Sequence, residues 1–260
     1  FYNCSSLTSL DLSHFDTSLV AVMGNMFEKC SKLEFLNLTD FDISKVKHMK
    51  SMFQSCSSLT SILLPNFDAT VVTTMNNMFA DCSSLTSLDL SGLKTATVQD
   101  MGYMFSGCSS LISLDLSNFD TSQVTLMSSM FYNCKSLTSL DLSMFDTGKI
   151  KNINSLFKGC TNLKFVDISN FNLSKITSMT EVFSGCTDLL FINFDNFTIK
   201  AGFSIENIFQ NVPGNVIYCI SNNESIQLIS DLLNTKKCTV NDCSEDWIKN
   251  KKNFIKERDL

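Results

Sequence analysis

The chain of 260 residues is 44% hydrophobic and 18% charged, so it can bury a core and does not belong to the disordered class. Its formal net charge is −6, which makes nucleic acid an unfavourable partner because phosphate binding needs clustered Lys and Arg. No stretch approaches the roughly 20 apolar residues of a membrane span, so we expect no membrane insertion within this chain.

A cysteine recurs at a constant interval of 26 residues through most of the chain, without insertion or deletion. Its eight positions are Cys4, Cys30, Cys56, Cys82, Cys108, Cys134, Cys160 and Cys186. A fixed period of this length is typical of a solenoid, in which each repeat contacts only its neighbours. We therefore expect one stacked array instead of several independent domains.

The first repeat shows the predicted elements in their order. Leu10 and Leu12 alternate with Asp11, which predicts a short strand with one buried face. Asp16 follows as the acceptor expected to close a turn. In residues 20–30, apolar side chains then recur at spacings of three and four, the pattern of one face of a short helix.

Later repeats keep apolar residues at the same positions, as a shared core requires. Stacking would place the strands about 4.8 Å apart in one parallel sheet, with the short helices on the opposite side. The predicted fold class is therefore an α/β repeat solenoid.

The regularity ends near Pro213-Gly214, a dipeptide that favours a stop. We expect the repeats to occupy residues 1–212 and a small C-terminal cap, beginning with a strand in NVIYCI, to occupy 213–243. Residues 244–260 suit an amphipathic helix or the start of a stalk. Since the chain opens inside a repeat, we also expect it to be a piece of a longer protein.

The unit C-S-S-L-T-S-L-D-L-S-x-F-D-T-S-x-V-x-x-M-x-x-M-F-x-x resembles the BspA-like leucine-rich repeat family, in its 26-residue variant from surface proteins of bacteria, mycoplasmas and unicellular eukaryotes. Residues 114–124 and 127–134 carry the match most clearly, and it covers about residues 1–212. The resemblance implies a leucine-rich-repeat solenoid and a cell-surface or secreted protein for adhesion or protein binding. It brings no catalytic or cofactor residues, so we expect neither an enzyme nor a cofactor.

The repeat cysteines stand in line with Phe and Met, which favours buried core residues. A zinc site needs paired ligands such as C-x2-C, and the repeats offer single cysteines, so no metal is expected. Cys219, Cys238 and Cys243 lie off the repeat. In an extracellular protein one disulfide is expected among them, with Cys219–Cys238 as first choice and Cys243 pairing elsewhere.

The outward strand positions form a row of polar residues in which carboxylates on neighbouring strands repel one another. A cation or a basic partner would relieve that repulsion, whereas the alternative is a solvated face that only keeps the sheet soluble. Aromatic residues in the neighbouring row are expected to be exposed anchors for a partner. The candidate binding face consists of Asp11, Asp89, Asp115, Asp141, Phe165, Asp167 and Phe191.

Two functions follow, and both are non-enzymatic. The array binds a protein or glycan ligand through the exposed sheet face, or it builds a surface layer or fibre by end-to-end self-association. His14 and His48 have no partner arrangement for catalysis. In a secreted eukaryotic protein, N-x-S/T sequences could carry glycans at Asn3, Asn37, Asn172, Asn196 and Asn223.

Overall fold

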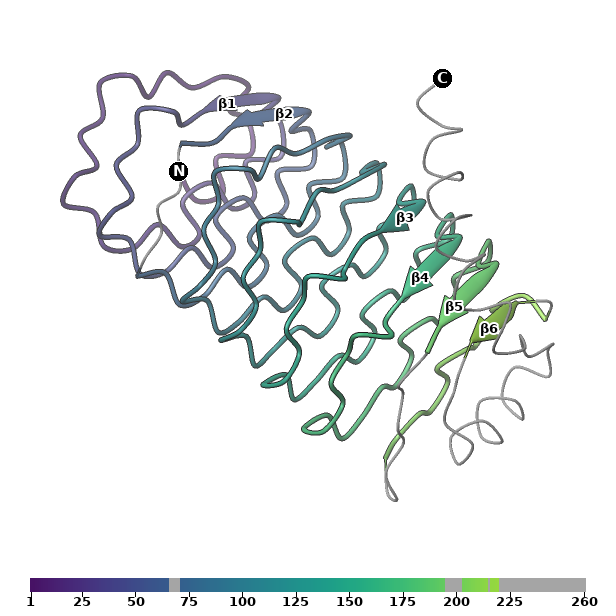
Figure 1. Cartoon of the computed structure of the whole chain (residues 1–260). Helices are drawn as coiled ribbons and strands as arrows, with labels where there is room; N and C mark the ends of the chain where they lie inside the picture. Colours follow the sequence, from purple (N-terminus) through teal and green to yellow (C-terminus); the bar gives the residue numbers. More distant parts are fainter. Residues whose placement is uncertain (66–70, 195–202, 215, 220–260) are drawn as a thin grey trace.

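The computed structural model describes residues 1–65, 71–194, 203–214 and 216–219, and in them the chain winds into a stack of similar coils (Figure 1). Each coil lies beside the next, so the predicted solenoid is confirmed. The strands are β1 Phe35–Asn37, β2 Ser61–Leu63, β3 Ser139–Leu140, β4 Phe165–Asp167, β5 Phe191–Asn193 and β6 Ile217–Cys219.

The strands pair in parallel with a register of 26 residues, as the repeat requires. Leu36 lies opposite Ile62 in β1 and β2, and Val166 lies opposite Ile192 in β4 and β5. Within the described residues the strands form two sheets, β1-β2 and β3-β4-β5-β6, instead of the one predicted sheet. With only two or three residues per strand, regular pairing is lost easily between coils.

A second ladder joins the coils through single-residue parallel bridges. It runs through Val22, His48, Thr74, Asp100, Leu126 and Asn152. These bridges lie in the part of each repeat for which a short helix was predicted, as Val22 does within residues 20–30. Each coil is therefore tied to the next along two separate lines.

The predicted short helices are wrong, because the described part of the chain contains no helix. Two residues in each repeat, such as Asn25 and Lys29, have a left-handed φ of 54° to 76°, which a right-handed helix excludes. Alternate N–H groups bond to the next coil instead. The N–H of Phe27 donates to the Met52 carbonyl at 2.9 Å, and that of Lys29 donates to the Gln54 carbonyl at 2.8 Å.

A run of tight turns explains why the sequence imitates a helix. Cys30 N–H donates to the Phe27 carbonyl at 3.1 Å, and Met26 N–H donates to the Met23 carbonyl at 3.4 Å. These turns bring Met23, Phe27 and Cys30 into the core, where their exposed fractions are 2%, 0% and 0%. Their spacing of four and three residues is that of a helical face, although the backbone follows another path.

A column of stacked phenylalanine rings occupies the centre of the core. Consecutive centroids lie 5.3 to 5.9 Å apart, with interplanar angles of 3° to 17°. The rings belong to Phe1, Phe27, Phe53, Phe79, Phe105, Phe131, Phe157, Phe183 and Phe209. Since the period has no insertion, each ring lies on the ring of the neighbouring repeat.

The repeat cysteines from Cys30 to Cys186 are buried, as predicted for core residues, and they also make a specific contact. The thiol of Cys56 donates to the Phe27 carbonyl of the preceding coil at 3.0 Å, and that of Cys82 donates to the Phe53 carbonyl at 3.1 Å. The same bond recurs in the later coils up to Cys186. The thiol therefore serves as a hydrogen-bond donor between coils as well as a small apolar group.

The strand predicted in NVIYCI is β6, which extends the second sheet. Tyr218 takes the inward position of β6 with no exposed surface, and among the described residues its hydroxyl has no hydrogen-bond partner. The remainder of the predicted cap from residue 220 and the predicted amphipathic helix of 244–260 lie outside the described residues and stay predictions. In the described part of the chain, no helix could span a membrane.

Candidate functional site

The outward positions of the strand side form the row of acidic residues that the sequence predicts. Asp89, Asp115 and Asp141 are exposed on consecutive coils, and Asp167 follows in β4 with intermediate exposure. Asp11 is exposed on the first coil. The structure thus brings Asp89, Asp115, Asp141 and Asp167 together, which we call the acidic row, while Asp11 stands apart from it.

Each carboxylate of this series closes a local turn. Asp115 Oδ1 accepts the backbone N–H of Ser117 at 2.9 Å, and Asp89 and Asp141 accept in the same way from Ser91 and Ser143. Asp11 and Asp167 make the equivalent bonds to Ser13 and Ser169 at 3.0 Å. The bond fixes where each carboxylate lies.

These hydrogen bonds lower the pKa of three of the carboxylates, Asp11, Asp89 and Asp115. The backbone N–H of Ser117, with its hydroxyl, lowers the pKa of Asp115, and Asp141 on the next coil opposes this by repulsion. The corresponding N–H groups of Ser13 and Ser91 lower the pKa of Asp11 and Asp89. Neighbouring coils therefore present fixed negative charges at neutral pH.

The aromatic part of the predicted binding face differs from expectation. Phe191 is only 8% exposed and packs with Cys219 and the partly buried Phe165, so its predicted exposure is wrong. The cause is the parallel register, which pairs Phe165 with Phe191 and Asn193 with Cys219. Phe165, Phe191 and Cys219 on the outer side of these strands thus cover one another, whereas Ile217 of β6 stays 42% exposed.

Two exposed apolar side chains on the same side were left out of the predicted face. Phe35 in β1 and Leu63 in β2 are each 48% exposed, and the register places them diagonally. Leu63 occupies the repeat position that Asp89 takes on the following coil, so the apolar pair adjoins the acidic row. Their departure from the Ser and Asp of other repeats was the signal that could have identified them.

The second series of carboxylates is structural, as the sequence predicts. Asp16 Oδ1 accepts the Ser18 N–H at 2.9 Å, and Asp42 accepts that of Ser44 at 2.9 Å. Asp120 and Asp146 repeat the contact, and Asp68 lies outside the described residues. The group closes a turn as expected, although no helix follows it.

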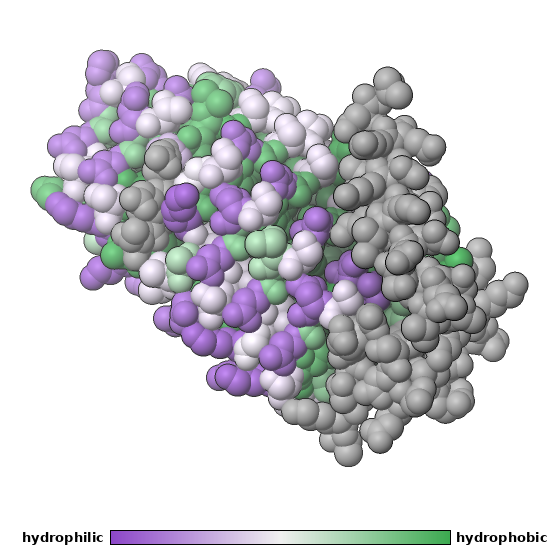
Figure 2. All heavy atoms as spheres, in the orientation of Figure 1, coloured by the Kyte–Doolittle hydropathy of each residue, from purple (hydrophilic) through white to green (hydrophobic). Residues whose placement is uncertain are grey.

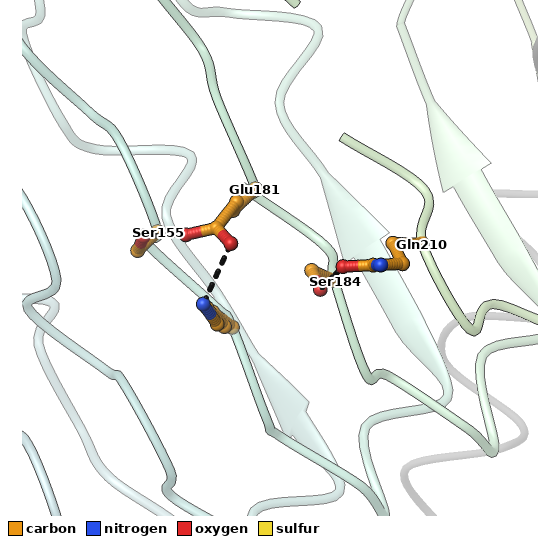
Figure 3. Close-up of polar contacts among 5 residues, drawn as sticks. Ser155, Glu181, Ser184 and Gln210 are labelled. Carbon is orange, nitrogen blue, oxygen red and sulfur yellow. Dashed lines mark hydrogen bonds and ion pairs between the residues drawn. The ribbon is translucent and has the colours of Figure 1, made fainter. Parts of the chain in front are cut away.

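An ion pair between neighbouring coils forms the polar cluster in Figure 3. Glu181 Oε1 lies 2.7 Å from Lys158 Nζ, and Ser155 Oγ donates to Glu181 Oε2 at 3.3 Å. The bond from Lys158 lowers the pKa of Glu181. Ser184 Oγ donates to Gln210 Oε1 at 3.5 Å beside it. Each of these contacts joins one coil to the next, which is a structural role.

A shallow groove of about 450 Å³ crosses the first four coils beside their serines. Ser57 Oγ donates to the Ser31 carbonyl at 3.3 Å, and Ser83 Oγ donates to the Ser57 carbonyl at 3.3 Å. Because these hydroxyls already donate between coils, the groove offers a ligand few free donors. The acidic row, with exposed carboxylates on consecutive coils, is the better candidate site.

The buried repeat thiols are poor candidates for a reactive centre. Burial raises the pKa of Cys56 and of Cys108 to about 12, far above the range of an activated nucleophile. In the described ranges, no group of three His, Cys, Asp or Glu could hold a metal ion. His14 and His48 are exposed at separate places in the repeat.

The covalent modifications expected from the sequence stay predictions. Asn3, Asn37 and Asn172 are exposed, whereas Asn196 and Asn223 lie outside the described residues. Cys219 is 1% exposed in β6, and Cys238, its expected disulfide partner, also lies outside that part of the chain, as does Cys243.

The described face in Figure 2 is largely hydrophilic, with hydrophobic residues showing between the polar ones. The family described as "Mycoplasma protein of unknown function, DUF285" matches residues 1–114, 35–137 and 110–216. No curated protein matches the chain significantly. The family match and the parallel 26-residue register confirm the predicted BspA-like leucine-rich repeat.

Two solved structures are similar to this chain. One is a leucine-rich repeat protein of T. pallidum, with 17% identity, a TM-score of 0.41, and coverage of 84% of this chain and 79% of that one. The other is a leucine rich cell surface protein of Faecalibacterium prausnitzii, with 20% identity, a TM-score of 0.37, and coverage of 88% and 76%.

Proposed function

Since the chain belongs to the family described as "Mycoplasma protein of unknown function, DUF285", whose repeats here form a leucine-rich solenoid, we propose that it is a non-enzymatic binding protein. It is exposed on the cell surface or secreted, and it serves in adhesion. Its ligand is a protein that docks on the outer side of the strands, over the acidic row and the adjoining Phe35 and Leu63.

The acidic row is the observation that carries this proposal. Four carboxylates on consecutive coils stand about 4.8 Å apart per step, and each is held by its own turn. Fixed charges need little further ordering when a partner binds, which favours affinity. A basic surface on the ligand would relieve the repulsion between Asp115 and Asp141.

Phe35 and Leu63 support an anchor beside the charges. Both side chains keep about half of their surface in water, although most other repeats have serine at the position of Phe35 and aspartate or asparagine at that of Leu63. An exposed aromatic ring next to fixed charges is typical of an interface centre. The expected ligand therefore carries lysines or arginines next to an apolar side chain.

The test compares two sets of substitutions that preserve the turns. In the triple variant D89N/D115N/D141N, asparagine keeps the acceptor oxygen, as Asn37 already does for the Thr39 N–H at 3.0 Å. The variant F35S/L63N restores residues found at these positions in other repeats. Binding to a panel of purified extracellular-matrix proteins is measured by surface plasmon resonance.

We expect each variant to lose at least tenfold in affinity for whichever matrix protein the native chain binds, with the Asp variant also losing salt dependence. The control D42N/D120N/D146N makes the same chemical change in the turn series and should bind normally. Equal binding by the native chain, the Asp variant and the control would contradict the proposed face.

A further inference from the structure

A compact group of positive charges lies on the second ladder of bridges, away from the strands. Lys45, Lys47 and Lys50 are exposed on one segment of the second repeat, with His48 between them. Lys45 lies near Asp16 and Asp42, whose pKa values it helps to lower as a lesser cause than the Ser18 and Ser44 hydrogen bonds. Lys47 and Lys50 make no ion pair within the described residues.

Exposed aliphatic side chains flank these lysines on both neighbouring coils. Leu19 is 81% exposed and Val22 is 61% exposed on the first coil, and Val71 is 39% exposed on the third. The bridges pair Val22 with His48 and His48 with Thr74, so the three segments lie side by side. Segments 19–25 and 71–77 carry no charged residue. We call Leu19, Val22, Lys45, Lys47, Lys50 and Val71 the basic patch.

The basic patch complements the acidic row in charge and in length. From Asp89 to Asp167 the row covers three steps between coils, or about 14 Å. From Lys45 to Lys50 an extended chain covers at most about 17 Å. The row runs along the stack, whereas the lysines follow the chain within one coil. The two lines therefore superimpose when two solenoids cross at roughly a right angle.

We propose that the basic patch of one copy docks on the acidic row of a second copy of this chain, with the two solenoids crossed. The inference rests on the proposed function, because it assigns a partner to the same strand face. Leu19 and Val22, one coil away from the lysines, would then lie beside the acidic row, over the stems of the facing side chains. The two surfaces differ, so the contact is heterologous and can continue into an open assembly.

The contact is expected to be weak and sensitive to salt, as a small interface built on charges is. Sedimentation velocity of the full chain at low salt should show a coefficient that rises with protein concentration. At about 0.15 M salt, where screening acts beyond roughly 8 Å, the rise should diminish. A native chain that stays monomeric at every concentration at low salt overturns the proposal.

A charge exchange tests the pairing itself. The variant K45E/K47E/K50E should weaken the self-association constant at least tenfold, because like charges then face each other. A second variant combines D89N/D115N/D141N with S87K/S113K/S139K, which makes the strand face basic without removing a turn acceptor. It should also be monomeric alone, and an equimolar mixture of the two variants should associate again.

Two controls make the outcomes distinct. The variant K32E/K135E/K149E makes the same charge change at exposed lysines elsewhere and should associate like the native chain. The variant K45E/K47E/K50E should still bind the matrix protein of the preceding test, so that loss of self-association alone leaves the proposed function standing. Folded variants that stay monomeric in the mixture, or heparin binding by the basic patch without self-association, overturn the crossed pairing.

Discussion

Replacing one ring of the phenylalanine column tests what holds the coils together. Phe105 has no exposed surface, and its ring lies 5.9 Å from Phe79 and 5.9 Å from Phe131, with interplanar angles of 3° and 8°. The substitution Phe105→Leu keeps an apolar side chain but removes both ring contacts. Each such pair contributes about 0.5–1.5 kcal/mol beyond burial, so the free energy of unfolding should fall by about 1–3 kcal/mol.

The matched control is Phe15→Leu. The Phe15 ring is 49% exposed and makes a tilted contact of 6.2 Å with Phe1, so this change should cost less than about 0.5 kcal/mol. The assay is equilibrium urea unfolding followed by circular dichroism under reducing conditions, with transition midpoints compared because a repeat array can depart from two-state behaviour. If both variants lower the free energy of unfolding by the same small amount, the stacked ring contacts add nothing beyond burial and the reasoning is refuted.

Three further predictions concern single groups. The pKa of Asp115 is lower in the folded state, so the ionised carboxylate stabilises the fold fully above the unfolded pKa of about 3.9, and this stabilisation is lost as the pH falls through the folded pKa. The substitution Asp115→Asn should therefore flatten this part of the pH dependence of the thermal midpoint. An unchanged pH dependence would count against the role of Asp115. A pKa near 12 reduces the thiolate share of Cys108 about a thousandfold relative to a value of 9.0, so alkylation with peptide mapping should label exposed Cys4 in the native chain and Cys108 only after unfolding. Finally, Tyr218→Phe removes a buried hydroxyl that has no partner in the part of the chain that the structure describes, and the free energy of unfolding should rise by up to about 1 kcal/mol in urea unfolding. A fall would mean that the hydroxyl is hydrogen-bonded.

The period and the inward residues could be predicted from the sequence, because burial leaves an apolar pattern whatever the backbone does. The helix could not be separated from the observed turns on the same evidence. Met23, Phe27 and Cys30 have helical spacing, but the left-handed residues at Asn25 and Lys29 decide the backbone path. Asparagine tolerates this conformation and glycine takes it at Gly107, Gly159 and Gly185, so Asn and Gly recurring at these positions were the available sign.

The candidate site was predictable in part for a similar reason. Alternation with buried leucines places Asp89, Asp115 and Asp141 outside, and the structure agrees. Alternation does not reveal whether an outward side chain is covered by its neighbours in other coils. Phe191 is covered and Phe35 is exposed, although both take the same position in the repeat.

Stacking in register gives many of the regular polar residues an internal partner, and this limits where recognition can arise. The repeat cysteine donates to a phenylalanine carbonyl, the turn aspartates accept backbone N–H groups, and buried Thr17 both donates to the Asp42 carbonyl and accepts its N–H. Changing such a residue damages the stack, so these positions can vary little for the sake of a ligand. Residues that depart from the repeat do not make these regular hydrogen bonds. Phe35 and Leu63 on the strand side depart from the serine and the acidic or amide residue of most repeats, and Lys45, Lys47 and Lys50 lie at positions that vary among the repeats. Together with the regular acidic row, these residues make up the surfaces proposed to bind partners.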